Sequence, residues 1–214
     1  MGKVNWIILM CIVSSVLSWF LSQTEYDVIL TYLAFSGENL RRGLLWTPVT
    51  ALFLHSDLLH LVGNMIFLFV FGNTLENELK SEKTLAVFFT GGVLSFLLST
   101  FFYDPETLMI GASAAIFTLA AVVMLVKPLK FSFLFFMPQG LVAVVYFIYN
   151  IAAVYLGVQS DVAYISHVIG FLIGIPFGIA WSKNWKRNLL ITFGLLVFYY
   201  LLQIYLIPAI LGNA

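Results

Sequence analysis

Charge and cysteine are both scarce in this chain of 214 residues. Only 9% of its residues are charged, and 10 Lys and Arg balance 10 Asp and Glu to a formal net charge of +0. Because no basic patch stands out beyond short loop clusters, we expect no nucleic-acid partner. The single cysteine, Cys11, excludes an intramolecular disulfide, a cysteine metal cluster and a redox pair.

Apolar residues dominate the rest of the sequence. They make up 62% of it, and a mean hydropathy of +1.02 is too high for a soluble domain, so we predict an integral, multi-pass membrane protein. The runs that approach the ~20 residues needed to cross a hydrocarbon core are 4–21, 58–75, 84–103, 108–126, 131 or 141 to 158, 162–181 and 189–206. We therefore predict an all-α, polytopic transmembrane helical bundle. Six core helices would lie in residues 1–182 and a seventh in residues 183–214, all in one domain.

Basic residues indicate the direction of these spans. Under strict alternation, the side of Lys3 also holds Lys80, Lys83, Lys127, Lys130, Lys183, Lys186 and Arg187. Only Arg41 and Arg42 fall on the opposite side, so the positive-inside bias predicts a cytoplasmic N-terminus and a C-terminus outside. The first run lacks a clear cleavage site after it, and we expect a retained helix rather than a secretory signal. The connection 22–57 is rich in apolar and aromatic residues, so we expect it partly in the membrane interface, with a plain extracellular hairpin as the alternative.

Unusual polar residues lie near the outer ends of the second, fourth and sixth runs. His60 and Asn64 are four residues apart and share one helix face. Ser113 lies near the start of the fourth run, and His167 lies early in the sixth. Hydrocarbon disfavours polar side chains, so several at one depth indicate a functional site.

Ser113 and His167 have the chemistry of an activated nucleophile and its base. A serine hydroxyl is weak until a base removes its proton, and histidine is the usual base near neutral pH. We expect a dyad rather than a triad, because the nearby acidic residues belong to loops: Asp104, Glu106 and Asp161. A developing oxyanion could be met by His60, Asn64 and the main-chain N–H of Ser113.

Other polar and small residues have structural interpretations. A membrane serine more often bonds to its own helix or packs against a neighbour, and this is our interpretation of Ser95, Ser99 and Ser166. His55 is expected in a loop or at the interface. Gly170 and Gly174, continued by Gly178, form a groove in which the fourth run could approach closely, and that packing would bring the serine and the histidine together.

Three separated motifs occur in the order His60-Leu-Val-Gly-Asn64, Gly111-Ala-Ser113-Ala and His167-Val-Ile-Gly170-Phe-Leu-Ile-Gly174. Together they resemble the rhomboid family of intramembrane serine proteases, whose six-helix core would cover about 4–181. The final span looks like the additional C-terminal helix of some members. Glu76 resembles the acidic residue that closes the family's second helix.

The resemblance implies a role for each motif residue. Ser113 would be the nucleophile, and His167 would be the general base and then the general acid. His60 and Asn64 would stabilise the oxyanion, and Gly111 would leave room for the substrate backbone.

The resemblance also implies that 22–57 forms a membrane-embedded first loop, and that the fifth helix with residues 158–161 gates a site reached by water from outside. Two positions depart from the family pattern. Many members have Trp-Arg in the first loop, whereas here Trp46 is followed by Thr47. Phe117 stands where a tyrosine commonly stacks against the histidine; it can still stack but has no hydroxyl.

We therefore expect hydrolysis of a peptide bond in or next to a transmembrane segment of another membrane protein, through an acyl-enzyme and without a metal or organic cofactor. The partners would be transmembrane protein substrates and the lipid bilayer, with the oligomeric state left open, and we expect the plasma membrane of a microbial cell. Two alternatives stand beside this one. The first is a rhomboid-like pseudoprotease that only binds membrane proteins, and the second is a small transporter or channel lined by His60, Asn64 and His167.

Overall fold

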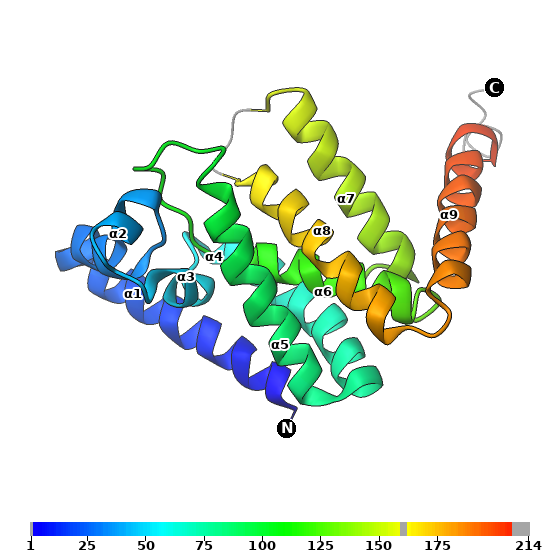
Figure 1. Cartoon of the computed structure of the whole chain (residues 1–214), viewed down its shortest axis with the longest axis horizontal. Helices are drawn as coiled ribbons and strands as arrows, with labels where there is room; N and C mark the ends of the chain where they lie inside the picture. The colour runs from blue at the N-terminus through cyan, green and yellow to red at the C-terminus, as the bar shows by residue number, and fades with distance from the viewer. Residues whose placement is uncertain (1, 159–161, 207–214) are drawn as a thin grey trace.

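The computed structural model describes residues 2–158 and 162–206, which are helical apart from loops and one short hairpin (Figure 1). In chain order the elements are α1 (Lys3–Leu33), α2 (Gly37–Arg41), α3 (Thr47–Thr50), the 3₁₀ turn η1 (Ala51–Phe53), α4 (Leu58–Phe67), the π-helical turn η2 (Leu68–Gly72), α5 (Asn73–Ser99), α6 (Ser113–Val126), β1 (Phe131–Ser132), β2 (Met137–Pro138), α7 (Gln139–Tyr155), α8 (Tyr164–Trp181), α9 (Trp185–Leu201) and the π-helical turn η3 (Leu202–Leu206). The two strands pair antiparallel.

Helices of membrane length confirm the all-α transmembrane prediction. Within the described residues, the stretches that are long and apolar enough to cross a bilayer are Lys3–Leu21, Leu58–Ser99, Tyr164–Trp181 and Trp185–Tyr205. The backbone leaves the helical region at Lys80, with φ 71° and ψ 165°, so Leu58–Ser99 holds two of the predicted spans. The helices α6 and α7 are apolar but shorter.

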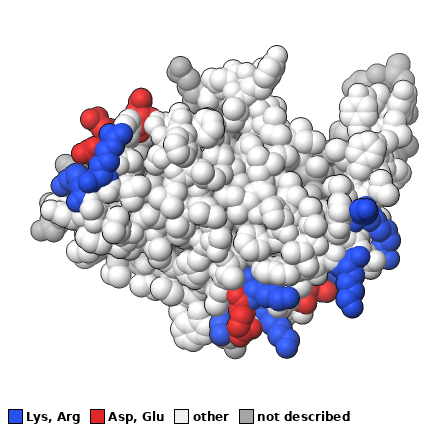
Figure 2. All heavy atoms as spheres, viewed as in Figure 1, with Lys and Arg blue, Asp and Glu red and all other residues white. Residues whose placement is uncertain are grey.

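Charged side chains gather toward opposite ends of the molecule in Figure 2, with a broad face of uncharged residues between them. Each charged end holds ion pairs of its own: Lys3–Glu82 at 3.6 Å and Lys127–Glu78 at 2.9 Å at one end, and Arg41–Glu38 at 4.0 Å at the other. An uncharged belt between two charged ends matches the polarity of a bilayer.

Helix α6 forms the centre of the bundle. All of residues 114–125 are buried, and the helix packs against α5, α7 and α8 (Figure 1). A helix that is apolar on every side must be enclosed by others, which is the arrangement observed. Helix α9 lies to one side of this group, against α6 and α7.

Glycines bring α8 against α6, as predicted. A Cβ added at Gly170 would collide with the carbonyl oxygen of Ala114, and one added at Gly174 would collide with that of Thr118. The hydroxyl of Thr118 in turn donates to the carbonyl oxygen of Gly170 at 2.9 Å. The close approach therefore depends on the missing side chains.

The connection over 22–57 is more regular than predicted. The first predicted span, 4–21, matches the apolar stretch Lys3–Leu21, and helix α1 continues beyond that span to Leu33. Trp46 donates its indole N–H to the carbonyl oxygen of Tyr32 at 2.8 Å, and the Thr50 hydroxyl donates to that of Leu33 at 2.7 Å. These bonds hold the connection to the end of α1 without the arginine that the family pattern has after Trp46.

Several other predicted boundaries are wrong. The third span ends at Ser99 rather than at residue 103. The fourth helix begins at Ser113 rather than at residue 108, because the backbone of Met109 pairs with Phe35 and Gly111 has a φ of 111°. The fifth begins at Gln139, close to the 141 alternative, because the preceding residues form the β-hairpin, and it ends at Tyr155 rather than at 158. The seventh begins at Trp185 rather than at 189.

Glu76 joins the end of the second span to the N-terminus of α1. Its carboxylate accepts the backbone N–H groups of Lys3 at 2.7 Å and Val4 at 3.3 Å, together with the Ser81 hydroxyl at 2.5 Å. The first N–H groups of a helix have no acceptor within it, and its positive end favours an anion. Glu76 thus caps α1 from another helix.

Candidate active site

Ser113 and His167 lie in hydrogen-bond contact where α6 and α8 meet. Ser113 is the first residue of α6, and His167 stands in the first turn of α8. The Ser113 Oγ and the His167 Nε2 are 2.7 Å apart. The glycine-dependent packing of the two helices sets this distance, and a hydroxyl at that distance can pass its proton to the imidazole.

Aromatic rings hold the imidazole in place. The ring of Phe117, one turn after Ser113, stacks on His167 with centroids 4.7 Å apart and planes 14° from parallel. Tyr164 meets the same imidazole edge-on at 6.4 Å. His167 is only 8% exposed, whereas Ser113 is half-buried, so the hydroxyl is the more accessible member of the pair.

Asn150 of α7 contacts the other nitrogen of His167. Its Oδ1 lies 2.8 Å from His167 Nδ1, and its Nδ2 donates to the carbonyl oxygen of Tyr146 at 2.8 Å. Asn150 was not predicted from the sequence, because only carboxylates were considered as a third member of the site. The signal available in the sequence was a single amide, Asn150, within an otherwise apolar and aromatic run.

His60 and Asn64 lie on α4, which Asp57 caps. The Asp57 carboxylate accepts the backbone N–H of His60 at 2.9 Å and the Ser56 hydroxyl at 2.7 Å, and these bonds lower the pKa of Asp57 below its ordinary value. The amide of Asn64 donates to the carbonyl oxygen of His60 at 2.8 Å.

Gly111 lies against His60. A Cβ at Gly111 would stand 2.8 Å from the Nε2 of His60, and the φ of 111° also favours glycine at this position. The N–H of Gly111 donates to the carbonyl oxygen of Ala51 at 2.8 Å. The imidazole of His60 therefore contacts the backbone segment that directly precedes Ser113.

The remaining polar residues of the prediction have other hydrogen-bond partners. His55 is in a loop, as expected; it is 2% exposed, and its Nδ1 lies 3.0 Å from the Ser15 hydroxyl. The hydroxyls of Ser95 and Ser99 donate to carbonyl oxygens one turn earlier, and Ser166 contacts Ser99 at 2.7 Å. Their interpretation as packing residues is confirmed.

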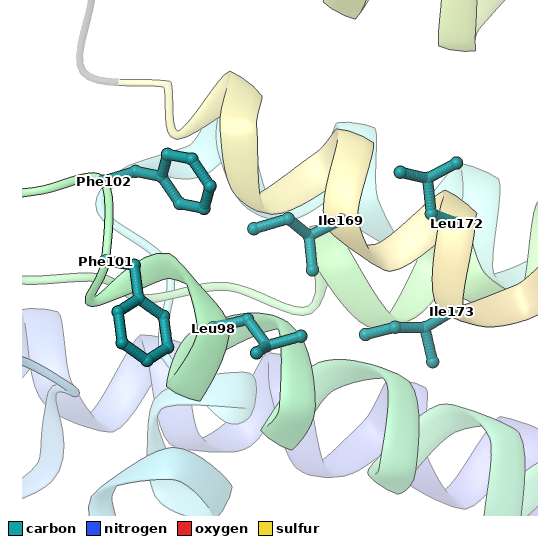
Figure 3. Close-up of a pocket in the computed structure, with 6 residues that line it drawn as sticks. All are labelled: Leu98, Phe101, Phe102, Ile169, Leu172 and Ile173. Atoms are coloured by element: carbon teal, nitrogen blue, oxygen red, sulfur yellow. The ribbon is translucent and has the colours of Figure 1, made fainter.

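A hollow of about 550 Å³ lies between the flanks of α5 and α8 (Figure 3). Its lining is entirely apolar: Leu98, Phe101, Phe102, Ile169, Leu172 and Ile173. Such a lining suits hydrocarbon and offers no group for chemistry. Among the described residues, no cluster of three His, Cys, Asp or Glu could hold a metal ion.

Known proteins are similar to this chain over the region that holds the site. The rhomboid domain family matches residues 42–184. Rhomboid-like protease 3 of Toxoplasma gondii is 36% identical over 110 residues, which cover 50% of this chain and 40% of that protein. Rhomboid-like protease 2 of the same organism is 26% identical over 147 residues, which cover 69% of this chain and 51% of that protein. Rhomboid-like protein 11, chloroplastic, of Arabidopsis thaliana is 35% identical over 79 residues, which cover 37% of this chain and 28% of that protein.

The chain thus spans about half, or less, of the length of these relatives. The family match extends from α3 across every helix that carries a residue of the site, up to the start of the last span. The chain belongs to the rhomboid domain family.

Proposed function

We propose that this protein is an intramembrane serine protease that cleaves peptide bonds in or near transmembrane segments of other membrane proteins. The observation that carries the proposal is the 2.7 Å contact between Ser113 Oγ and His167 Nε2. In this proposal residues 1–182 are the protease core, and residues 183–214 supply an additional helix of the same domain.

The proposed reaction is acyl transfer through a serine ester. His167 Nε2 takes the hydroxyl proton while Ser113 Oγ attacks the substrate carbonyl carbon. The resulting imidazolium then protonates the leaving amine as the peptide C–N bond breaks, which leaves an acyl-enzyme. Water, deprotonated by the same imidazole, attacks the ester and releases the carboxylate product, and the proton returns to Ser113.

Three donors are proposed for the oxyanion that forms in each step. The main-chain N–H of Ser113 belongs to the first turn of α6, where N–H groups lack partners within the helix and carry its positive end. His60 Nε2 faces Gly111, and Asn64 keeps one amide proton beyond the one that it donates to His60. Removal of one such donor typically lowers kcat about 10²- to 10³-fold.

The substrate must expose its carbonyl group to Ser113. A transmembrane helix hides each carbonyl in its own hydrogen bonds, so we propose substrates that unwind locally at Gly, Pro or polar residues. Small side chains before the cut would suit the crowded glycine and alanine surroundings of Ser113. We further propose that the N-terminus is cytoplasmic, the C-terminus outside, and the host membrane the plasma membrane of a microbial cell.

The test is cleavage of a labelled transmembrane substrate by purified protein in liposomes. We expect wild-type protein to cleave it and to label with a serine-directed fluorophosphonate, and Ser113→Ala to do neither. Ser18→Ala is the matched control, because that hydroxyl donates within its own helix, to the carbonyl oxygen of Ser15 at 2.8 Å. Equal cleavage by Ser113→Ala would overturn the proposal. If the wild-type protein binds the substrate but neither cleaves it nor is labelled, the protein is a pseudoprotease. If the liposomes show solute flux and the protein is not labelled, it is a channel or transporter.

A further inference from the structure

We propose that Asn150 is a positioning residue that completes a hydrogen-bonded chain Ser113–His167–Asn150, in which α7 holds the imidazole in the tautomer that can accept the serine proton. The inference rests on the proposed function, because it assigns His167 as the base. It adds a residue to the site that lies outside all three motifs.

The orientation of the Asn150 amide follows from its two contacts. Its Nδ2 lies 2.8 Å from the carbonyl oxygen of Tyr146, which can only accept, so this end of the amide must be the NH₂ group. The oxygen therefore faces His167 Nδ1 at 2.8 Å. An amide flip would set two acceptors against each other at Tyr146.

This orientation determines where the imidazole carries its proton. An amide oxygen only accepts, so the Nδ1 of His167 must donate to it. In the neutral ring the lone pair then belongs to Nε2, which lies 2.7 Å from the Ser113 hydroxyl. That tautomer is the one a general base needs, since the opposite one would point an N–H at the serine.

The amide is itself held by its surroundings. Asn150 is 1% exposed. The aromatic ring of Tyr146, one turn earlier on α7, packs on Phe117 of α6 with centroids 5.6 Å apart and on Phe67 of α4 at 4.5 Å. Helix α7 is thereby fixed between the helices that carry the nucleophile and His60.

A neutral amide suits a buried position better than a carboxylate. An ionised group in an apolar interior is strongly unfavourable unless it is paired. Asn150 can orient the ring without bringing a charge into the bundle. The titratable groups that face His167 from the elements around it are Tyr164 of α8 and His60 of α4.

The first test reads the tautomer directly and needs no substrate. The chain has 3 histidines, so ¹⁵N-histidine NMR of the full-length protein in micelles can be assigned with His167→Ala as the reference. We expect a protonated Nδ1 and an unprotonated Nε2 for neutral His167 in the wild type. In Asn150→Leu, which has a similar volume and no acceptor, we expect Nε2–H to appear. A wild-type Nε2–H tautomer, or no change in Asn150→Leu, would overturn the proposal.

The second test separates positioning from folding. The penalty for a buried N–H without an acceptor is equivalent to a change of roughly 5- to 150-fold in a rate constant. We therefore expect kcat per fluorophosphonate-reactive site to fall by roughly that factor in Asn150→Leu, with little change in KM. Asn150→Asp should restore kcat, and the acidic limb of its kcat–pH profile should move to higher pH, because a carboxylate stabilises the imidazolium.

Asn188→Leu is the matched control, because that buried amide donates to the carbonyl oxygen of Leu125 at 2.7 Å, away from His167. It should lower thermal stability and leave kcat per reactive site unchanged. If Asn150→Leu behaves like Asn188→Leu, Asn150 is only structural. If the tautomer shifts as expected while wild-type protein cleaves nothing, the proposed function fails and the positioning geometry stands.

Discussion

Phe117 lies flat against the imidazole of His167, with ring centroids 4.7 Å apart and planes 14° from parallel. The stacking fixes the ring without a hydroxyl, so we predict that Phe117→Tyr retains activity. Phe117→Leu removes the stacked face, and since such pairs contribute about 0.5–1.5 kcal/mol, kcat should fall by roughly 2- to 12-fold. Cleavage kinetics normalised to fluorophosphonate labelling measure this change. Phe133 is 81% exposed, so Phe133→Leu should leave kcat unaltered; an equal loss there would show that the effect of Phe117→Leu does not come from stacking on His167.

Gly170 sets the separation of the two helices that carry the proposed nucleophile and base. A Cβ there would meet the carbonyl oxygen of Ala114 in the backbone of α6, which cannot move aside as a side chain can. We predict that Gly170→Ala destabilises the protein by about 1–3 kcal/mol, as overpacking does, and abolishes fluorophosphonate labelling of Ser113. Gly194→Ala on α9, where an added Cβ meets nothing within 4 Å, should keep both stability and labelling. Normal labelling of Gly170→Ala would show that α6 and α8 can accommodate a Cβ at this position without separating Ser113 from His167.

Sequence patterns predicted the spans and the meeting of Ser113 with His167, because both depend on local features. Apolar runs mark the helices, and the spacing of Gly170 and Gly174 marks the face of α8 that lies against another helix. Helix ends were predicted less well. The residues before Ser113 are as apolar as a helix, and the pairing of Met109 with Phe35 together with the positive φ of Gly111 keeps them out of the helix.

Asn150 could not be placed from the sequence for a related reason. Helix α7 is apolar on nearly every side, so its pattern does not show which face meets α8. The bond to His167 depends on how α7 is rotated, which the packing of Tyr146 against two other helices determines. Unlike α8, whose glycine spacing marks its packing face, α7 has no periodic signal for the face that meets its neighbours.

Asp57 stabilises the start of α4, and its contribution should depend on pH. Its carboxylate caps the N-H of His60 at 2.9 Å, so Asp57→Ala should lower stability at neutral pH by about 1 kcal/mol. The folded pKa of Asp57 is below its ordinary value, so this contribution is fully present above the unfolded pKa of about 3.9 and is lost as the pH falls through the folded pKa. Thermal unfolding in detergent should therefore show a gap in Tm between wild type and Asp57→Ala at pH 7 that narrows below about pH 4. A gap that is constant with pH would assign the effect to packing rather than to the carboxylate.

Lys80 occupies a backbone conformation that suits glycine, at the turn between the second and third spans. Its φ of 71° and ψ of 165° fall in a region that L-residues enter at a cost of about 1–3 kcal/mol. Lys80→Gly relieves that strain but gives the unfolded chain more freedom, so we predict a net gain of about 1 kcal/mol, seen as a rise in Tm of roughly 2–4 °C. Lys83→Gly is the matched control, because it removes the same charge within the regular part of α5, where glycine costs about 1 kcal/mol, and it also removes the cation–π contact with Trp181 at 5.1 Å. The two variants should move Tm in opposite directions. A fall in both would show that the ammonium group of Lys80 matters more than its backbone.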